Sequence, residues 1–314
     1  MRILSLFSGA GGLDFGLIRA GNKVIWANDI DKDAVATYRQ NIGDHIICRD
    51  IKNIDIDSLP TPQVVVGGFP CQGFSLANRM RTLADERNQL YRFFYDTIRI
   101  KQPLFFIAEN VKGILSLGNG EAIKQILADF GEAGYYTEKH LVNMADYGVP
   151  QTRQRVIIIG QRKDLGEKML FHFPQPSYDK NALGGRQKWV TIQEAIGHLP
   201  DPDTPNNLPN HIYSAYKVEY RNFTGHRQTD PNKPSPTILA RGNGKGGVCA
   251  IPHYNGKRRL SIRESASVQT FPENFEFHGT MNSCYRQIGN AVPVLFAEQL
   301  GKELVRVEQE EKLP

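Results

Sequence analysis

The sequence predicts an α/β fold, in which a doubly wound, mostly parallel sheet is joined to a smaller, irregular domain rich in loops and β-structure. Up to about residue 165, short apolar runs alternate with amphipathic segments of helical period. The runs are apolar at successive positions, which is typical of parallel strands covered by helices on both faces. From Pro176 to Ile262 this periodicity fades, and the segment holds 9 of the 18 prolines together with 9 glycines.

The apolar runs define the expected strands, which cover residues 2–7, 23–29, 45–50, 62–68, 104–111 and 155–162. The amphipathic segments define the expected helices, at residues 13–21, 31–41, 89–103 and 120–134. Gly21 suits the position after a helix end, and Pro103 stops the helix before it. Regular patterning returns at residues 261–271, and an amphipathic helix follows within residues 291–311.

The composition is that of a globular protein with one large domain, or one large and one small. The 314 residues are 40% hydrophobic and 23% charged, which allows a core of ordinary depth. The four cysteines form neither a CxxC pair nor a Cys/His cluster, so we expect no disulfide framework and no metal site. No apolar run approaches the roughly 20 residues of a membrane span, so we predict a cytoplasmic protein without membrane association.

Positive charge is concentrated in the irregular segment. The chain carries a net charge of +5, whereas residues 176–262 alone carry +6, from 12 Lys or Arg against 6 Asp or Glu. Such a segment can be the electrostatic footprint of a polyanion. A solvated surface with a chance asymmetry of charge is the alternative interpretation.

The run ILSLF leads into the turn SGAGG and then into a helix, which is typical of a nucleotide cofactor site. Gly9 and Gly11 let the backbone approach a ligand closely, although a plain turn is the alternative. Asp14 stands where a dinucleotide-binding pattern has its third glycine, so the residues favour another cofactor. A carboxylate there would repel a pyrophosphate but suit a cation such as a sulfonium, which Phe7 could face.

Acidic residues end the next two expected strands. Asp29 is placed for ribose hydroxyls, and Asp50 could accept a hydrogen bond from an adenine amino group. Both could instead cap the helices that follow. Since carboxyl ends of parallel strands meet at one edge of a sheet, the glycine turn and the two acids together predict an adenosine site.

The stretch GGFPCQGFS follows the fourth expected strand and carries Cys71 to the same edge of the sheet. Pro70 stiffens the turn, and the neighbouring glycines let the chain bend sharply. A thiolate presented there would be a strong nucleophile. Alone, a cysteine is more often a buried and inert side chain, so its neighbours decide between the two interpretations.

Those neighbours are one acidic residue and two arginines. Glu109 and Asn110 end the strand LFFIAENV, and Glu109 could donate or accept a proton there. Arg153 and Arg155, in QTRQR, are two residues apart and would share a face of an extended segment. They could donate hydrogen bonds to an anion or a carbonyl group, or form salt bridges. A thiol, an acid and cationic donors suit the addition of a thiolate to an electron-poor ring.

Six motifs, in this order and spacing, carry a resemblance to the DNA (cytosine-5)-methyltransferases of bacterial restriction–modification type: LFSGAGGLDFGL, GGFPCQGFS, AENV, QTRQR, RESASVQTFP and YRQIGNAVP. The resemblance covers nearly the whole chain except residues 176–260, where that family has its variable target-recognition domain. It implies the S-adenosylmethionine-dependent methyltransferase fold. We accordingly expect a catalytic and cofactor-binding domain at 1–175, a recognition domain at 176–262, a hinge at 263–282 and a returning segment at 283–314.

The resemblance implies S-adenosylmethionine as the cofactor and a base-flipping mechanism on duplex DNA. Its implied cofactor residues are Phe7, Gly9, Gly11, Gly12, Asp29, Ile30, Asp50, Ile51, Asn290 and Val292. Cys71 would add to C6 of the target cytosine, Glu109 would hydrogen-bond N3, and Arg153 would hold O2 with Arg155 supporting the site. The enamine that forms would take the methyl group at C5, and elimination of Cys71 would follow.

The implied DNA contacts lie in two segments. Ser75, Arg79 and Arg87 belong to a stretch that resembles the family's mobile loop, and the arginines suit phosphates or a solvated helix face. Thr237 belongs to the family's Thr-hydrophobic pair. Arg241 and Lys245 follow on a glycine-rich loop, where a cation could read a guanine or contact phosphates only.

The implied partner is duplex DNA, with a cognate restriction endonuclease in the same system but not in a stable complex, and the chain is expected to be a monomer. A tRNA cytosine-5 methyltransferase is the alternative. The sequence departs from the commonest family pattern at Asp29 (usually Glu), Ile30 (often Trp), Phe69 (often Pro) and Thr270 (often Gly). None of these positions carries a catalytic group.

Overall fold

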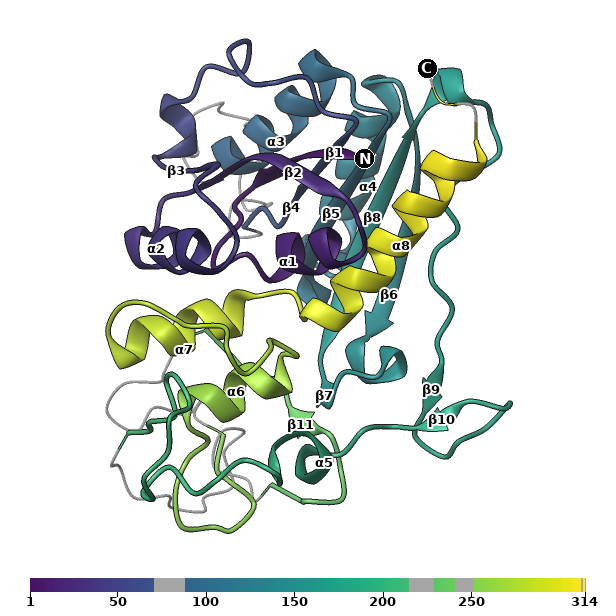
Figure 1. The fold of residues 1–314 in the computed structure, drawn as a ribbon. Helices are drawn as coiled ribbons and strands as arrows, with labels where there is room; N and C mark the ends of the chain where they lie inside the picture. Colours follow the sequence, from purple (N-terminus) through teal and green to yellow (C-terminus); the bar gives the residue numbers. More distant parts are fainter. Residues whose placement is uncertain (71–87, 215–228, 241–250, 312, 314) are drawn as a thin grey trace.

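A computed structural model describes residues 1–70, 88–214, 229–240, 251–311 and 313. Its main feature is a seven-stranded sheet of order β3-β2-β1-β4-β5-β8-β6 (Figure 1). The strands are β1 (Arg2–Leu6), β2 (Lys23–Asp29), β3 (Ile46–Cys48), β4 (Val64–Gly67), β5 (Phe105–Val111), β6 (Tyr135–Asn143) and β8 (Gln154–Arg162). The first five are parallel, and β8 runs antiparallel to both β5 and β6. The predicted doubly wound, mostly parallel sheet is confirmed.

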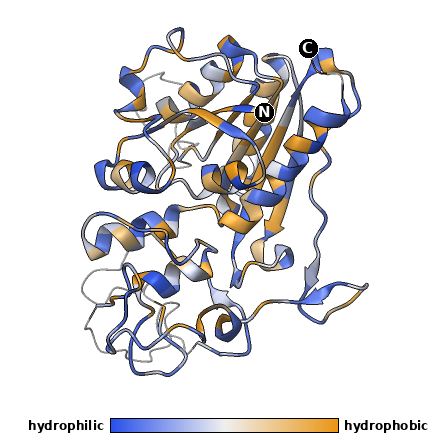
Figure 2. Ribbon diagram, in the orientation of Figure 1, coloured by the Kyte–Doolittle hydropathy of each residue, from blue (hydrophilic) through white to orange (hydrophobic). Residues whose placement is uncertain are grey.

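Helices cover both faces of the sheet, because neighbouring strand residues point to opposite sides. Val64 and Val66 of β4 join the core beneath α1 and α8, whereas Val65 joins the core beneath α3 and α4. All three side chains are fully buried, which is why the strand is apolar at every position. The helices are α1 (Gly12–Arg19), α2 (Lys32–Asn41), α3 (Asn88–Lys101), α4 (Glu121–Glu132) and α8 (Val294–Glu310). In Figure 2 the sheet forms the most hydrophobic part of the molecule.

Strand β6 has no counterpart among the strands expected from the sequence. Its burial alternates irregularly, with exposed Glu138 and Lys139 at its centre, because it lies at the edge of the sheet. An edge strand is covered less than a central one, so it lacks the continuous apolar run that revealed the others. Helix α7 (Met281–Asn290) also lies within a segment where no helix was expected.

The smaller domain is irregular in the residues that are described. Its strands β9 (Tyr178–Asp179), β10 (Gln187–Lys188) and β11 (Ser235–Pro236) are two residues long, and its helices are α5 (Ile192–Ile196) and α6 (Ile262–Val268). Strand β11 pairs with β7 (Gln151–Thr152), which precedes β8 in the chain and so ties the domain to the sheet (Figure 1).

The segment expected to be a hinge, 263–282, takes part in a core of its own. Three phenylalanines of this segment, Phe271, Phe275 and Phe277, pack with α6, α5 and α7. Packing against the sheet resumes only at α8, which lies on α1 (Figure 1). Helix α7 already contacts α2 of the large domain, where Thr37 Oγ1 donates to Gln287 at 2.7 Å and Arg286 pairs with Asp31. The expected domain bounds stay a prediction.

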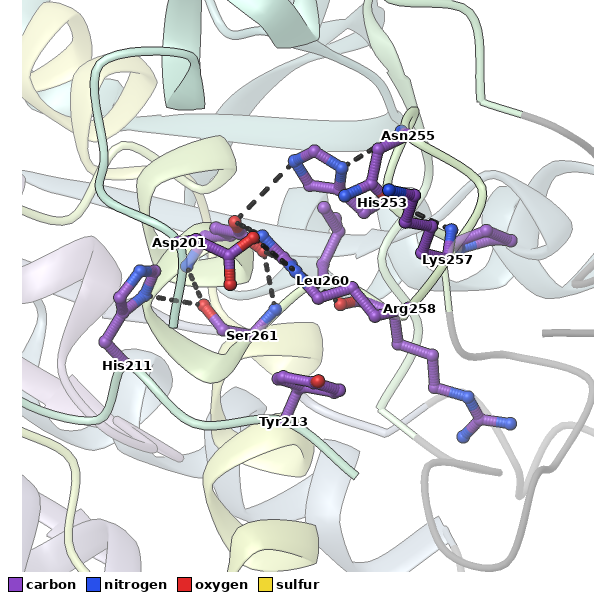
Figure 3. A network of polar contacts seen from close by, with 12 residues as sticks. Asp201, His211, Tyr213, His253, Asn255, Lys257, Arg258, Leu260 and Ser261 are labelled. Carbon is purple, nitrogen blue, oxygen red and sulfur yellow. Dashed lines mark hydrogen bonds and ion pairs between the residues drawn. The ribbon is translucent and has the colours of Figure 1, made fainter. Parts of the chain in front are cut away.

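A buried ion pair holds the end of the small domain together. Both guanidinium Nη atoms of Arg258 donate to the carboxylate of Glu264, each at 2.7 Å, and Ser261 N donates to the same carboxylate. His211 contacts Ser261 Oγ at 3.0 Å, and burial lowers the pKa of nearby His253 (Figure 3). Glu264 and Ser261 form a capping box, so the network fixes the start of α6 to the loop before it.

Helices α1 and α8 approach closely at two glycines. A Cβ on Gly16 would lie 2.5 Å from both the Cβ of Ala297 and the carbonyl oxygen of Val294. A Cβ on Gly301 would lie 2.7 Å from the Cβ of Ala20. The crossing therefore requires small residues on both helices, which brings the start of α8 against the glycine turn.

We expect Gly16→Ala to lower the free energy of unfolding by about 1–3 kcal/mol, because the backbone of α8 cannot move away from a methyl group. The matched control is Gly131→Ala in α4, where a Cβ meets nothing within 4 Å. That variant should gain about 0.5–1 kcal/mol, since alanine restricts the unfolded chain. Urea denaturation measures both, and equal effects would contradict the close crossing.

Candidate active site

One pocket of about 730 Å³ opens at the carboxyl ends of β1, β2, β4 and β5. Its lining extends from the glycine turn after β1, past the end of β2 and the segment before η1 (Ile51–Asn53), to Glu109 and Arg155. Residues of α7 and of the link to α8 close the remaining side. The volume falls in the range of about 300–1,000 Å³ that is usual for small-ligand sites. The predicted cofactor end and the predicted chemical end thus share one cavity.

The glycine turn forms one wall of the pocket. Phe7 and Gly9 have positive φ angles of 56°, which turn the chain out of β1. A Cβ on Gly9 would meet nothing within 4 Å, so the turn leaves open space where a ligand could approach the backbone. Gly12 lines the pocket but also packs tightly, because a Cβ there would lie 2.6 Å from the carbonyl oxygen of Val292.

Gly11 differs from the expectation that it contacts the cofactor. It does not line the pocket, and a Cβ there would collide with Ile42 and approach Tyr38 at 2.8 Å. Its φ of 87° also favours glycine. Gly11 is required for the packing of α1 on α2.

Asp29 and Asp50 line the pocket, and each has a backbone partner. The two carboxylate oxygens of Asp29 accept from the backbone N–H groups of Gly9 and Asp31, each at 2.8 Å. Asp50 accepts from Lys52 N and caps η1, as the alternative interpretation of this residue allowed. Asp29 does not cap α2, because Asp31 does. Asp29 therefore holds the glycine turn in place.

The other expected cofactor residues also lie around the pocket. Ile30 is 67% exposed, the most exposed of the large hydrophobic side chains that are described, whereas Ile51 is buried beneath it in the wall. Asn290 and Val292 return to the pocket between α7 and α8. An exposed isoleucine at a pocket mouth suits an apolar ligand face.

Asp14 is among the residues that line the pocket, but its carboxylate is bound within the protein. Its side chain is fully buried, and its oxygens accept from Ser5 Oγ at 2.7 Å and from Tyr38 Oη at 2.9 Å. Burial raises its pKa from 3.8 to about 6, against the effect of the two hydrogen bonds. The hydroxyl of Tyr38 also contacts Nε2 of His45, at 3.0 Å. Asp14 therefore supports the turn from below.

The turn that leads to the predicted nucleophile is fixed by Asn110. Its Nδ2 donates to the carbonyl oxygen of Phe69 at 2.9 Å, and Pro70 lines the pocket. A Cβ on Gly68 would lie 3.0 Å from Oε2 of Glu109, so the chain passes close to the carboxyl. Among the expected site residues, Cys71, Ser75, Arg79 and Arg87 lie outside the described part of the chain.

Glu109 and Arg155 form the polar end of the pocket. Nε of Arg155 lies 2.7 Å from Oε1 of Glu109, and the two side chains are only 12% and 13% exposed. The strands dictate this pair, because β5 and β8 are antiparallel neighbours and both residues lie at their ends on the same edge of the sheet. A carboxyl and a guanidinium side by side offer an acid and a planar donor to one ligand.

Arg153 is among the residues that line the pocket, but its guanidinium is bound by backbone carbonyls of the protein. Its side chain is 1% exposed, and its guanidinium donates to the carbonyl oxygens of Ile238, Gly289 and Ala291. Burial, together with the charge of Arg155, lowers the pKa of Arg153 to about 9. Arg153 stands between β7 and β8 rather than within a strand, so the two arginines do not share one role.

Thr237, expected to contact DNA, uses its hydroxyl within the protein. It donates to the carbonyl oxygen of Thr152 at 2.7 Å and so joins the small domain to β7. Arg241 and Lys245 lie outside the described residues. Gln287 and Gly289 line the pocket but were not expected to. The sequence signal for Gly289 is its place in the IGNAVP motif. The structure shows why glycine is needed there, because a Cβ would collide with the backbone of Leu239.

The described residues also bear on metal binding and on membrane association. They contain no group of three His, Cys, Asp or Glu side chains that could hold a metal ion. Within the same part of the chain, no helix has the length and apolarity to cross a membrane.

The strand order and the glycine turn at the first strand define a methyltransferase of the S-adenosylmethionine-dependent fold class. The family model for C-5 cytosine-specific DNA methylases matches residues 1–306. The chain belongs to this family and is a DNA (cytosine-5)-methyltransferase, as the six motifs predicted.

Curated relatives match over nearly the whole chain. The Type II methyltransferase M.NgoFVII of Neisseria gonorrhoeae is 37% identical, and the match covers 98% of this chain and 87% of the relative. M.FnuDI of Fusobacterium nucleatum is 38% identical, with coverages of 97% and 94%. A solved structure of a candidate DNA modification methyltransferase encoded within a prophage (E. coli) superposes with a TM-score of 0.76 at 27% identity, covering 99% of this chain and 100% of that chain.

We expect Asp14→Asn to change how stability depends on pH. In the wild type the pKa of Asp14 is raised on folding, so folding retains its proton and this stabilising effect is lost as the pH rises from about 4 to about 6. Asparagine keeps the partners Ser5 and Tyr38 without titrating. The free energy of unfolding of the variant should therefore rise relative to that of the wild type as the pH increases across this window, by up to about 3 kcal/mol above pH 6.

The control is Asp31→Asn, where the sign is opposite. Although burial opposes it, the hydrogen bond and charge of Arg286 lower the pKa of Asp31. Its contribution is lost as the pH falls, so that variant should be less stable at neutral pH and equal to wild type in acid. Chemical denaturation from pH 4 to 8 measures both variants. A constant difference between wild type and Asp14→Asn across this range would disprove the assignment.

Proposed function

We propose that the chain methylates C5 of a cytosine within a short specific sequence of duplex DNA, with S-adenosylmethionine as the methyl donor. The observation that carries the proposal is the pocket that joins the glycine turn to the Glu109–Arg155 pair, whose lining also includes Phe69 and Pro70 just before Cys71. A cofactor at one end of this pocket and a base at the other would be adjacent.

The cofactor end fits an adenosine group with a cationic tail. The open space above Gly9, the exposed side chain of Ile30 and the carboxylates of Asp29 and Asp50 offer backbone contact, an apolar face and acceptors. When bound, S-adenosylmethionine would supply an electrophilic methyl group on its sulfonium. Nearby Phe7 offers the aromatic face that a sulfonium prefers.

The base end fits a cytosine that has left the helix. Within a duplex the C5–C6 edge is stacked, so the base must be flipped out, at a cost of a few kcal/mol. Cys71 would then form a bond from its sulfur to C6, while Glu109 as the acid hydrogen-bonds N3. The resulting carbon nucleophile at C5 takes the methyl group. A base removes the C5 proton, and the electron pair of that C–H bond expels the Cys71 thiolate.

We assign the donor to O2 of the cytosine to Arg155 rather than Arg153. Arg155 lies beside Glu109, whereas the guanidinium of Arg153 is used by three backbone carbonyls. A planar guanidinium next to the acid could contact the O2–N3 edge of one base together with it. Asn110 positions the turn before Cys71.

Duplex DNA as the substrate is supported by family membership and by the charge of +6 in residues 176–262. The family model favours DNA over tRNA, whereas the charge suits either polyanion. Ser75, Arg79, Arg87, Arg241 and Lys245 stay proposed contacts to DNA. A monomer in the cytoplasm, with a separate restriction endonuclease of the same specificity, is part of this proposal.

The recognition site is found first, by bisulfite sequencing of DNA from a host that expresses the chain. A duplex with 5-fluorocytosine at the mapped position should then trap a covalent complex when S-adenosylmethionine is present, because fluorine cannot leave C5 as a cation. Denaturing electrophoresis detects the complex. Cys71→Ser should give none, and a complex formed by that variant would refute the proposed nucleophile.

We expect substitution of Arg155 to affect catalysis and substitution of Arg153 to affect stability. Arg155→Lys should keep the wild-type melting temperature and lose about 100-fold or more in kcat, because a lysine cannot reproduce the planar donor. Arg153→Lys should lower the free energy of unfolding by about 2–4 kcal/mol, because buried carbonyls lose their donors. Thermal unfolding and single-turnover methylation measure the two effects. Full activity of a folded Arg155→Lys variant would contradict the assignment.

A further inference from the structure

A second cavity adjoins the active site at the edge of the sheet, and apart from Arg155 its residues have no role in the proposed chemistry. This flanking groove has a volume of about 630 Å³ and lies beside the small domain, where β5 and β6 end and β8 begins. It shares Val111 and Arg155 with the main pocket. Its lining is Val111, Lys112, Gly113, Asn143, Thr152, Gln154, Arg155, Thr237 and Leu239.

The register of the sheet builds the floor of the flanking groove. Val111 lies opposite Arg155 in the β5–β8 pairing, and Asn143 lies opposite Gln154 in the β6–β8 pairing. The small domain contributes the other wall through Thr237 and Leu239. The groove is therefore fixed by hydrogen-bonded strands on one side and by the recognition domain on the other.

Apolar groups are exposed in the flanking groove. Val111 is 45% exposed and Leu239 is 42% exposed, among few large hydrophobic side chains that are so exposed in the described residues. They come from different domains and line the same groove. Exposed apolar side chains on both sides of a groove suit a flat or weakly polar group such as a nucleobase or a deoxyribose.

Polar groups of the flanking groove suit the rest of a nucleotide. Nζ of Lys112 donates to Oε1 of Gln154 at 3.0 Å, and within the described residues it forms no ion pair with a carboxylate. Its charge is therefore available to an anion and is held beside that of Arg155. Oδ1 of Asn143 is buried and accepts no hydrogen bond from a described residue.

We propose that the flanking groove binds the nucleotide next to the flipped cytosine on the same strand, with Lys112 contacting its phosphate and Val111 and Leu239 contacting its sugar and base. This inference rests on the proposed function, because the main pocket must hold the cytosine. The two cavities share Val111 and Arg155 in their linings, so a strand whose base enters the main pocket passes close to the groove. Arg155 would then link recognition of the neighbour to the geometry at the reacting base.

The test is a binding cycle between Lys112 and single phosphates of the duplex. DNA that carries the mapped site is prepared with one neutral methylphosphonate linkage, on the 5′ or the 3′ side of the target cytosine. Fluorescence anisotropy gives Kd for wild type and Lys112→Ala over a range of salt concentrations. The matched control is Lys124→Ala, since Lys124 lies on α4 and pairs with Glu121 outside the groove.

We expect Lys112→Ala to weaken DNA binding about 5- to 20-fold and to reduce the slope of log Kd against log salt concentration by about 0.9, as one lost phosphate contact requires. One methylphosphonate should weaken the wild type to a similar extent and leave Lys112→Ala unchanged. Lys112→Arg should retain most of the affinity, and Lys124→Ala should match the wild type. Affinity for S-adenosylmethionine should be the same in all four proteins.

Two results would overturn the inference. One is a wild-type affinity and salt slope for Lys112→Ala. The other is a neutral linkage that weakens wild type and Lys112→Ala equally at both positions, because the lysine would then contact neither phosphate. A failure of the proposed function looks different, since bisulfite mapping would then find no methylated cytosine and the 5-fluorocytosine duplex would trap no complex.

Discussion

The active site depends on one buried guanidinium. Arg153 leaves the sheet between β7 and β8, where its Nη atoms donate to Ile238 in the small domain and to Gly289 and Ala291 at the end of α7. Three segments that are far apart in the chain are thereby held against the same edge of the sheet. A buried charge is tolerated only when such acceptors satisfy it, so the arrangement is strongly specified. Arg155, two residues later in the chain, does not bind these carbonyls and instead pairs with Glu109.

A second constraint is the glycine turn, which is supported from three directions. Asp29 accepts the N–H of Gly9, Asp14 lies buried beneath the turn, and the backbone of Val292 approaches Gly12 from the link to α8. A side chain at position 9 would occupy the space where a ligand approaches the turn. Gly9 has no side chain, and that space is open. Rigidity around an open backbone is what a cofactor site needs, because the protein then loses little entropy on binding.

The same edge of the sheet also explains why the two cavities are neighbours. Near its carboxyl end β5 contributes Glu109 to the main pocket and Val111 to both pockets, and it stays paired with β8 as far as Val111. β8 is antiparallel and begins at this edge, so it contributes Arg155 to both. Inserting an antiparallel strand thus adds a cationic donor to an edge that otherwise holds carboxyl ends. Thr270 illustrates a local cost of the fold, since it adopts a φ of 61° where the family often has glycine.

The sequence by itself determined the doubly wound sheet and its residues at the strand ends, because fully buried parallel strands leave continuous apolar runs and their last residues meet at one edge. It also determined the family, through six ordered motifs. It missed β6, whose edge position leaves no such run, and it gave no sign that Gly11 supports packing or that Asp14 is held by Ser5. Only the tertiary structure decided which of Arg153 and Arg155 faces the acid. Spacing places two such residues on one face of an extended segment, whereas the partners that satisfy each guanidinium come from distant parts of the chain.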